Sequence, residues 1–332
     1  MARNALLLIA MMLMTLGCAI YRSPPASPEA DELLVMDNDF IIIRSRPGDR
    51  YEAIAKRFFG SADAHDRLRA LNPKLNPAGG TLVAIPARAH NLAAVDDRGY
   101  RTIPILCYHQ FTPNAKARHQ LDLTASGFRA QLQYLHDQGY QVLRLADLEK
   151  FLSGQRQIPR KSVILTIDDG YRSFYEVAFP ILKEFGYPAT LFVYTDFIGG
   201  NAALTWNQML AMQATGLVDI QSHGKSHSSL ADPKDDPVAY RRWVKEELTK
   251  PAVILKKKLG HQTDLFSYPY GATSDTAINL LKQQGVRLAA TVEQGGNPSF
   301  ADPLRLKRTM IYATDDLDRF SRKLAIFKKT RF

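Results

Sequence analysis

The stretch Val163-Ile164-Leu165-Thr166-Ile167-Asp168-Asp169-Gly170-Tyr171 decides how this chain of 332 residues can fold and work. Its first five residues are aliphatic or β-branched, which is typical of a buried strand. Two adjacent carboxylates follow, and because side chains alternate along a strand they point in different directions. One can therefore bind a cation while its neighbour accepts a proton. The alternative is that both only cap the helix into which Gly170 turns the chain.

The composition describes a folded, basic protein. Hydrophobic residues make up 45% of the chain, an ordinary value for a globular core, and the length suggests more than one unit. The formal charge of +10 favours anionic surroundings. The basic residues are scattered, and the one tight run, Lys256-Lys257-Lys258, is typical of the solvated face of a helix. Nothing in the chain is similar to a nucleic-acid-binding module, so we expect no nucleic-acid partner.

The N-terminus reads as an export signal. A positively charged start precedes an apolar run, residues 5–16, that is too short to span a bilayer comfortably. It ends in Met14-Thr15-Leu16-Gly17-Cys18, which resembles a bacterial lipobox. The resemblance implies a signal peptide over 1–18 and a lipid anchor on Cys18. Because Ala19 follows instead of Asp, it also implies the periplasmic face of the outer membrane. An ordinary cleaved signal or an uncleaved anchor is the alternative.

The chain has two cysteines, Cys18 and Cys107. If Cys18 carries lipid, Cys107 has no partner, and the exported protein holds together without an internal disulfide. Cys107 lies in an apolar run, which predicts a small buried hydrophobe and not a reactive thiol.

A small unit is expected at 38–87, after a flexible tether over 19–37 that is rich in Pro, Ser and Ala. A strand at 40–44, helices at 51–59 and 63–71, and a strand at 81–86 give the order β-α-α-β. This order and four segments resemble a LysM carbohydrate-binding module, which implies binding to N-acetylglucosamine-containing glycans such as peptidoglycan. The segments are Pro47-Gly48-Asp49, Ile54-Ala55-Lys56-Arg57-Phe58, Leu71-Asn72-Pro73 and Leu82-Val83-Ala84-Ile85-Pro86. The alternative is a spacer that binds nothing.

A linker over 88–100 leads into one large domain, 101–332. Strand-like runs alternate with amphipathic stretches along this domain, which implies parallel strands wrapped by helices. A barrel with its chemistry at the C-terminal ends of the strands is the natural closure. The strands are expected at 103–108, 163–167, 189–194, 217–221 and 286–292, and the helices at 126–138, 173–185, 237–259 and 274–284.

Two further segments place polar groups at strand ends. His223 and His227 follow a strand and are four residues apart, so a helical turn would put both on one face. Two imidazoles and one carboxylate form the three-ligand pattern of a catalytic metal with an open position. The third segment, Phe266-Ser267-Tyr268-Pro269-Tyr270-Gly271, predicts an irregular loop that aims a backbone N–H into the site. A plain β-turn is the alternative.

Taken together, these segments resemble the polysaccharide deacetylase family (NodB homology, carbohydrate esterase family 4). The matching pieces, in the family's order, are Thr166-Ile167-Asp168-Asp169-Gly170, His223-x-x-x-His227 and Tyr268-Pro269-Tyr270-Gly271. The resemblance implies an α/β fold, a distorted (β/α)7 barrel. It also implies roles: Asp168 is the general base, Asp169, His223 and His227 bind the metal, and the backbone N–H of Tyr270 serves the oxyanion hole.

Two departures from the family pattern narrow the resemblance. Ser267 stands where many members have an Arg that tunes the base, and no His follows His261 to act as the acid. Both absences resemble the biofilm branch that deacetylates poly-β-1,6-N-acetylglucosamine. That branch carries an early Cys-Tyr-His, here Cys107-Tyr108-His109, which implies that His109 is the acid. A structural His at a strand end is the alternative.

The expected function is therefore metal-dependent hydrolysis of N-acetyl groups in an N-acetylglucosamine polysaccharide of the cell envelope. The divalent cation is expected to be zinc, with cobalt or nickel as alternatives. Trp206 and Tyr171 are candidates to stack on sugar rings or to pack in the core. A peptidoglycan deacetylase and a non-catalytic glycan-binding lipoprotein are the rival functions.

Overall fold

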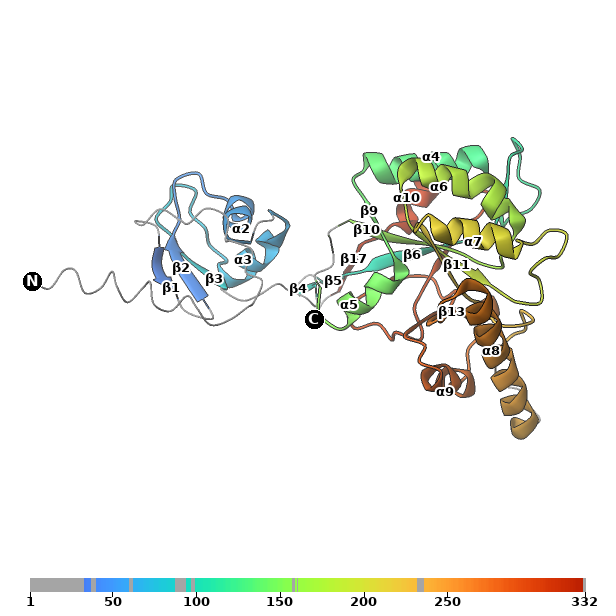
Figure 1. Cartoon of the computed structure of the whole chain (residues 1–332). Coiled ribbons are helices and arrows are strands. Elements are labelled where there is room, and N and C mark those ends of the chain that lie inside the picture. The colour runs from blue at the N-terminus through green and yellow to red at the C-terminus, as the bar shows by residue number, and fades with distance from the viewer. Residues whose placement is uncertain are drawn as a thin grey trace, which may run out of the picture. The chain divides into compact units, whose positions relative to one another are not determined.

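The computed structural model describes residues 33–36, 40–59, 62–86, 94–96, 99–156, 159, 161–231 and 236–330. The chain divides into two units, Met1–His90 and Asn91–Phe332, which are described separately (Figure 1). The predicted signal peptide, Cys18 and most of the predicted tether lie outside the described residues. Among the residues that are described, no helix combines the length and the apolar character needed to cross a bilayer.

The first unit is a three-stranded antiparallel sheet with helices packed on it. The strands β1 (Leu33–Met36), β2 (Phe40–Arg44) and β3 (Leu82–Pro86) lie in that order, and α2 (Tyr51–Phe59), η1 (Ala62–Ala64) and α3 (His65–Leu71) join β2 to β3. The expected β-α-α-β order is present. However, β1 lies inside the predicted tether and pairs with β2, so the folded unit begins before residue 38. The core of this unit consists of Ile43, Ile54, Ala55, Leu68, Val83 and Ile85.

The second unit is built on a curled parallel sheet, as the alternation of strands and helices predicts. Its order is β14 (Leu288–Ala290), β13 (Leu265–Ser267), β12 (Val218–Ser222), β11 (Ala189–Val193), β10 (Ser162–Ile167), β6 (Ile103–Tyr108). Strand β16 (Thr309–Met310) lies parallel to β6, and a parallel bridge joins Ala290 of β14 to Leu306, just before β16. The two ends of the parallel sheet are therefore connected through 306–310. Strand β15 (Gly296–Asn297) pairs antiparallel with β6, and β9 (Gln141–Leu143) pairs with the start of β10.

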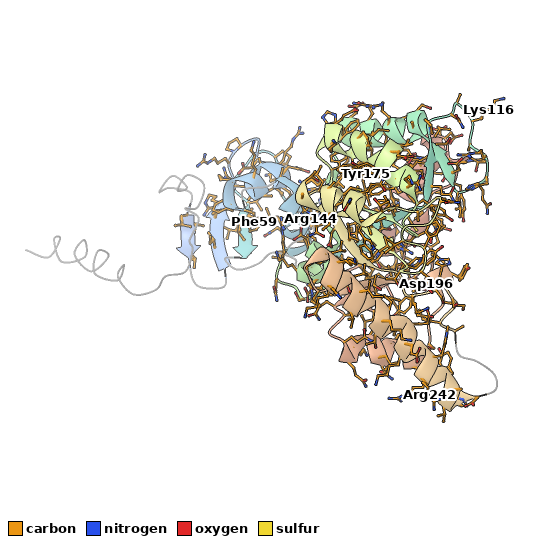
Figure 2. The ribbon with its side chains drawn as sticks, turned by 45° about the vertical axis from the view of Figure 1, so that its right-hand side comes forward. Phe59, Lys116, Arg144, Tyr175, Asp196 and Arg242 are labelled. Atoms are coloured by element: carbon orange, nitrogen blue, oxygen red, sulfur yellow. The ribbon has the colours of Figure 1, made fainter. Side chains whose placement is uncertain are left out.

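Helices cover the sheet on both sides. In Figure 1, α4 (Ala125–Asp137), α6 (Phe179–Phe185) and α10 (Leu317–Lys323) lie together, with α8 (Pro237–Leu259) and α9 (Asp275–Gln283) below the strands. One end of α8 projects from the unit and carries Arg242 (Figure 2). The remaining helices are η2 (Leu145–Asp147), α5 (Leu148–Leu152), η3 (Phe174–Ala178), α7 (Trp206–Ala214) and η4 (Pro269–Gly271).

The predicted linker contains structure that belongs to the second unit. Strands β4 (Val95–Asp96) and β5 (Gly99–Arg101) pair with each other, and β5 also pairs with β17 (Phe327–Lys329) near the end of the chain. The second unit therefore begins before residue 101. Strands β7 (Gln110–Thr112) and β8 (Asp122–Thr124) form a separate parallel pair beyond the end of β6.

Candidate active site

The acidic pair lies where β10 ends, and the backbone separates its two side chains. Asp168 continues the strand, whereas Asp169 has a left-handed backbone with φ 76°. Gly170 follows with φ 84°, and a Cβ there would come within 2.9 Å of Cγ1 of Val193 on β11. A residue with a side chain would push this turn away from the neighbouring strand, so glycine is required here. The two carboxylates consequently face different surroundings.

The two histidines lie in a loop after β12, and the expected helical turn is not formed. The loop is held by the chain after β11, because the N–H groups of Thr195 and Asp196 donate to the carbonyls of Gly224 and Lys225. His227 adopts φ 59°, a left-handed conformation that turns the chain at that point. The imidazoles are thus brought together by a turn of this loop, and not by the helical turn that a spacing of four residues suggests.

A buried carboxylate of α8 braces this loop. Glu247 is 5% exposed and accepts hydrogen bonds from the backbone N–H and from Oγ of Ser226, each at 2.9 Å. Ser226 directly precedes His227, so these bonds fix the approach to the second imidazole. This support cannot be recognised from the sequence, because Glu247 lies within an ordinary amphipathic helix.

Asp169, His223 and His227 converge on one point. Nδ1 of His223 lies 2.7 Å from the carbonyl oxygen of Ser267, to which it donates, so Nε2 is directed toward Asp169. Nε2 of His223 and Nε2 of His227 lie 3.5 Å and 3.1 Å from Oδ1 of Asp169. The three candidate ligand atoms all lie within 4.8 Å of one another.

This group fits a divalent cation. Oδ1 of Asp169 is buried and has no hydrogen bond of good geometry among the described residues, although two imidazole nitrogens face it. A buried oxygen without a hydrogen bond is costly, and a shared cation would satisfy it. One carboxylate and two imidazoles form a donor set typical of catalytic metal sites, with room for water or substrate.

The electrostatics of the group agree with this assignment. Burial lowers the pKa of His223, but the carboxylates of Asp168 and Asp169 outweigh that effect and raise it. Burial raises the pKa of Asp169, but the imidazoles of His223 and His227 outweigh it and hold the pKa far below its ordinary value. The site thus concentrates negative charge that a proton or a cation must balance, and a bound cation replaces the proton.

Asp168 belongs to a separate, enclosed network centred on Arg308. The Arg308 side chain is fully buried, and its Nη1 and Nη2 donate to Oδ1 and Oδ2 of Asp168 at 2.7 and 2.6 Å. Burial raises the pKa of Asp168, but the charges of Arg308 and His223 outweigh it and bring the pKa to about 2. Asp168 is therefore ionised over the whole physiological range, as a proton acceptor must be.

Ser267 and Cys107 complete the surroundings of Asp168. Oγ of Ser267 donates to Oδ2 of Asp168 at 3.1 Å and accepts from Nη2 of Arg308 at 2.8 Å. The thiol of Cys107 approaches the same oxygen at 3.6 Å. Cys107 is fully buried and burial raises its pKa, so it is the buried, unreactive thiol that the sequence predicts. Oδ2 is thus occupied by three donor groups, and Oδ1 keeps room for another.

Sequence reasoning did not find Arg308. It noted that the family's guanidinium is missing at Ser267, but the structure supplies one from just before β16, where it also contacts Ser267. The only local sign is a basic residue in the short run Leu306-Lys307-Arg308-Thr309-Met310, which a two-residue strand makes hard to recognise.

Comparison with known proteins identifies this arrangement. Residues 155–289 match the family model described as "Polysaccharide deacetylase", and the match includes the acidic pair, both histidines and the Tyr270 loop. The second unit contains a polysaccharide deacetylase domain. His109 and Arg308 lie outside the matched range.

Relatives of this deacetylase domain have names that specify a substrate. Poly-beta-1,6-N-acetyl-D-glucosamine N-deacetylase of Escherichia coli (strain K12) is 25% identical over an alignment of 256 residues, and the match covers 66% of this chain. The enzyme of that name from Staphylococcus epidermidis is 26% identical over an alignment of 217 residues, and the match covers 63% of this chain. The chain spans only 38% of the length of the first relative and 74% of the second. The structure of IcaB from Ammonifex degensii is similar with a TM-score of 0.60 and 28% identity, covering 68% of this chain and 97% of that one.

His109 directly follows β6 and reaches the deacetylase site. A ring nitrogen of His109 lies within 4.8 Å of both the Asp168 carboxylate and the Cys107 sulfur. Its Nδ1 is buried and has no hydrogen-bond partner among the described residues. Burial lowers its pKa more strongly than the nearby Asp168 carboxylate raises it. The imidazole is thus neutral at rest, with one nitrogen free to accept a proton.

Tyr270 lies at the rim of the deacetylase site, in the short helix η4. Its backbone has φ 59°, its side chain is 67% exposed, and its ring centre is 4.6 Å from that of His227. Among the described residues, four that are not glycine have a positive φ, and three of these are Asp169, His227 and Tyr270. Such strained conformations collect at functional sites because the surroundings impose them.

The two candidate sugar-stacking residues lie in different surroundings. Tyr171 is partly exposed, and its ring lies edge-on to Phe197 with 5.2 Å between centres. Burial, followed by the charge of Asp169, raises the pKa of Tyr171. Trp206 begins α7, packs against the main core and lies beneath Nζ of Lys258. Tyr171 therefore remains a candidate for sugar contact, whereas Trp206 fits the packing alternative. The rings of Tyr194 and Phe197, which the sequence did not suggest, extend the aromatic rim beside Tyr171 and His227.

Proposed function

We propose that this protein is a metal-dependent N-deacetylase that removes acetyl groups from N-acetylglucosamine units of poly-β-1,6-N-acetylglucosamine. The observation that carries the proposal is the convergence of Asp169, His223 and His227 beside a second carboxylate, Asp168, held by other partners. The activity for which the relatives are named supports the choice of polymer. The fold assigned to the second unit is the distorted (β/α)7 barrel of the family, with β16 as the strand that completes the ring.

In this proposal the chain's own residues manage the protons of amide hydrolysis. When bound, the divalent cation polarises the acetamide carbonyl and makes the attacking water more acidic. Asp168 takes a proton from that water while the oxygen of the water bonds to the carbonyl carbon. The backbone N–H of Tyr270 donates to the oxygen that becomes negative. The C–N bond then breaks, giving acetate and the free amine of the sugar.

His109 is proposed to protonate the departing nitrogen. The lowered pKa means that its imidazole starts the reaction neutral and first has to receive a proton. Its position within 4.8 Å of Asp168 supports transfer from the base that has just taken one from water. The proton removed from water would thus return to the leaving amine, and the net reaction consumes one water.

Zinc is the proposed cation, with cobalt and nickel as alternatives. Two imidazoles and one carboxylate suit all three ions, and zinc is the most frequent partner of such open catalytic sites. Elemental analysis of protein purified without added metal tests the choice. Removal of the metal with a chelator should abolish activity, and a titration with the three ions would rank them.

The decisive test measures acetate released from purified polymers by the full chain with zinc added. We expect release from poly-β-1,6-N-acetylglucosamine, with free amines appearing in equal number. Faster release from peptidoglycan would instead support the second candidate, a peptidoglycan deacetylase, which the LysM-like first unit favours. No release from either polymer, or from a chitin oligomer, would support the non-catalytic alternative and contradict the proposal.

We further propose that the protein acts in the cell envelope, exported through its signal peptide and anchored by lipid on Cys18. The lipobox-like sequence supports the anchor, and the strand order of the first unit supports a LysM-like module that holds glycan near the enzyme. Mass spectrometry of the mature N-terminus tests the lipid. A pull-down on peptidoglycan with and without the first unit's exposed Leu82 substituted by Asp tests glycan binding.

A further inference from the structure

A cavity lies at the opposite end of β6 from the deacetylase site. It has a volume of about 730 Å³ and is bordered by β5, β15, β17 and the segment 298–307. Asn297 and Gly296 of β15 pair with Ile103 and Pro104 at the start of β6, whereas His109 follows the end of that strand. Six residues of strand separate the two places by roughly 20 Å. The cavity is therefore separate from the catalytic residues, and its size is within the range of ligand sites.

Aromatic rings give this cavity its apolar surface. Tyr100, Phe300 and Phe327 line it, and the Phe300 side chain is 63% exposed. The Tyr100 ring lies edge-on to Phe300 with 5.0 Å between centres, which holds the exposed ring in place. An exposed aromatic ring at the wall of a cavity is available to contact a ligand. An aromatic face is suited to the apolar face of a pyranose ring.

The charges around the cavity are mostly neutralised by one another. Lys307 pairs with Glu293, and Arg305 pairs with Asp275 at 2.9 Å. Asp302 accepts a hydrogen bond from the N–H of Leu304 and keeps its negative charge, which is opposite in sign to the charge of Lys328 in the same lining. Because opposite charges cancel in this way, little field remains to attract a phosphate or another strongly charged ligand. A neutral ligand with hydrogen-bonding groups fits this lining better.

Two side chains indicate which sugar would bind. The exposed amide of Gln294 has no hydrogen-bond partner among the described residues and can both donate to and accept from an acetamide. Nζ of Lys328 lies 5.9 Å from the centre of the Tyr100 ring, and Lys328 forms no ion pair with another described residue. Its positive charge opposes the ammonium group of a deacetylated unit. An acetylated unit is therefore favoured over a deacetylated one.

We propose that this cavity is a second glycan subsite, which binds N-acetylglucosamine rings of the polymer that are still acetylated. The idea rests on the proposed deacetylase function, and it adds a reason why the enzyme stays on unreacted polymer. A chain bound at the cavity raises the local concentration of further units at the catalytic site. Once its units carry free amines, the same chain is held less tightly and leaves.

Kinetics on substrates of different length test the subsite. In the metal-loaded full chain, Phe300→Ala should raise KM for the long polymer roughly tenfold, the effect of one lost aromatic contact. The kcat on polymer, and both constants on an N-acetylglucosamine trimer too short to reach both places, should not change. Phe300→Trp should behave like the unaltered chain. The matched control is Val238→Ala, which removes an exposed apolar side chain from α8.

Direct binding separates this inference from the proposed function. Asp169→Ala disables the catalytic site, and calorimetry with a β-1,6-linked N-acetylglucosamine hexamer should still show binding that a second substitution, Phe300→Ala, weakens. The fully deacetylated hexamer should bind less tightly. If the unaltered, zinc-loaded chain released no acetate while hexamer binding still depended on Phe300, the proposed function would be wrong but the subsite would stand. Normal deacetylation with polymer KM and hexamer binding unaffected by Phe300→Ala would overturn the subsite alone.

Discussion

The two halves of the deacetylase site are built in opposite ways. Around Asp168, side chains from β6, from β13 and from the residue just before β16 enclose the carboxylate, and that residue, Arg308, donates to both its oxygens. Around Asp169, loop residues with left-handed backbones leave a buried oxygen without a good hydrogen bond. In the enclosed half, around Asp168, these donors fix the carboxylate in one orientation. In the open half, around Asp169, the carboxylate keeps room for a cation. The contrast indicates why two adjacent aspartates can have different roles.

The largest effect is expected from Asp169→Ala, which removes the one carboxylate that, among the described residues, lies close to both imidazoles. Two histidines alone hold a divalent cation weakly, so the purified variant should contain little metal and release acetate only at the background rate. Elemental analysis and the acetate assay measure the two effects together. A variant that kept a full equivalent of zinc would remove Asp169 from the ligand set and erase the distinction between the halves.

Asp168→Asn should have the next largest effect and a different signature. The amide keeps the shape of the side chain but cannot accept the proton of water, so kcat should fall by about 10²- to 10⁴-fold. Zinc content should stay at one equivalent, because the open half is unchanged. Comparison of zinc content with kcat in this variant and in Asp169→Ala is the sharpest test of the two roles. Near-normal turnover here would show that another group is the base.

Arg308→Met breaks the enclosed half without touching the cation ligands. It leaves a buried carboxylate without its partner, which typically costs about 3–5 kcal/mol of folding stability. The pKa of Asp168 is about 2 with Arg308 present. The ionised Asp168 therefore contributes fully to folding stability above the ordinary carboxyl pKa, and this contribution is lost as the pH falls toward 2. Without Arg308 the effect of burial prevails, and the pKa of Asp168 rises.

Folding stability and kcat should therefore depend on pH differently in Arg308→Met than in the unaltered chain. Denaturation and rate measurements against pH test this. Its stability deficit should shrink on acidification, because protonation removes the unpaired charge, and the acid limb of kcat should move to higher pH. Arg129→Met, which removes an exposed guanidinium paired with Glu184, is the control and should leave both profiles unchanged. Profiles that coincide with those of the unaltered chain would show that Arg308 does not set the state of the base.

The open half was largely predictable from the sequence, whereas in the enclosed half the sequence located Asp168 but not its partner Arg308. Asp168, Asp169 and His223 lie at the ends of strands that their own residues specify, so local patterns located them. Arg308 is 140 residues from Asp168 and acts through a contact that leaves no periodic signal. His227 shows the limit of spacing arguments, because an interval of four suggested a helix where the chain forms a loop. Local sequence patterns show where a strand ends, but they do not show which distant residue pairs with a side chain at that end.

The smallest expected effect, from Ser267→Ala, tests how much the enclosed half depends on Arg308 alone. The change removes one donor to Oδ2 of Asp168 and one acceptor from Arg308, yet the two direct bonds of the guanidinium remain. A hydrogen bond of this kind contributes about 1 kcal/mol, so kcat should fall roughly fivefold with zinc content unchanged. Ser267→Thr, which keeps the hydroxyl, is the matched control. A loss as large as that in Arg308→Met would mean that the serine and the arginine act as one unit, and that the carboxylate needs all of its partners to remain a base.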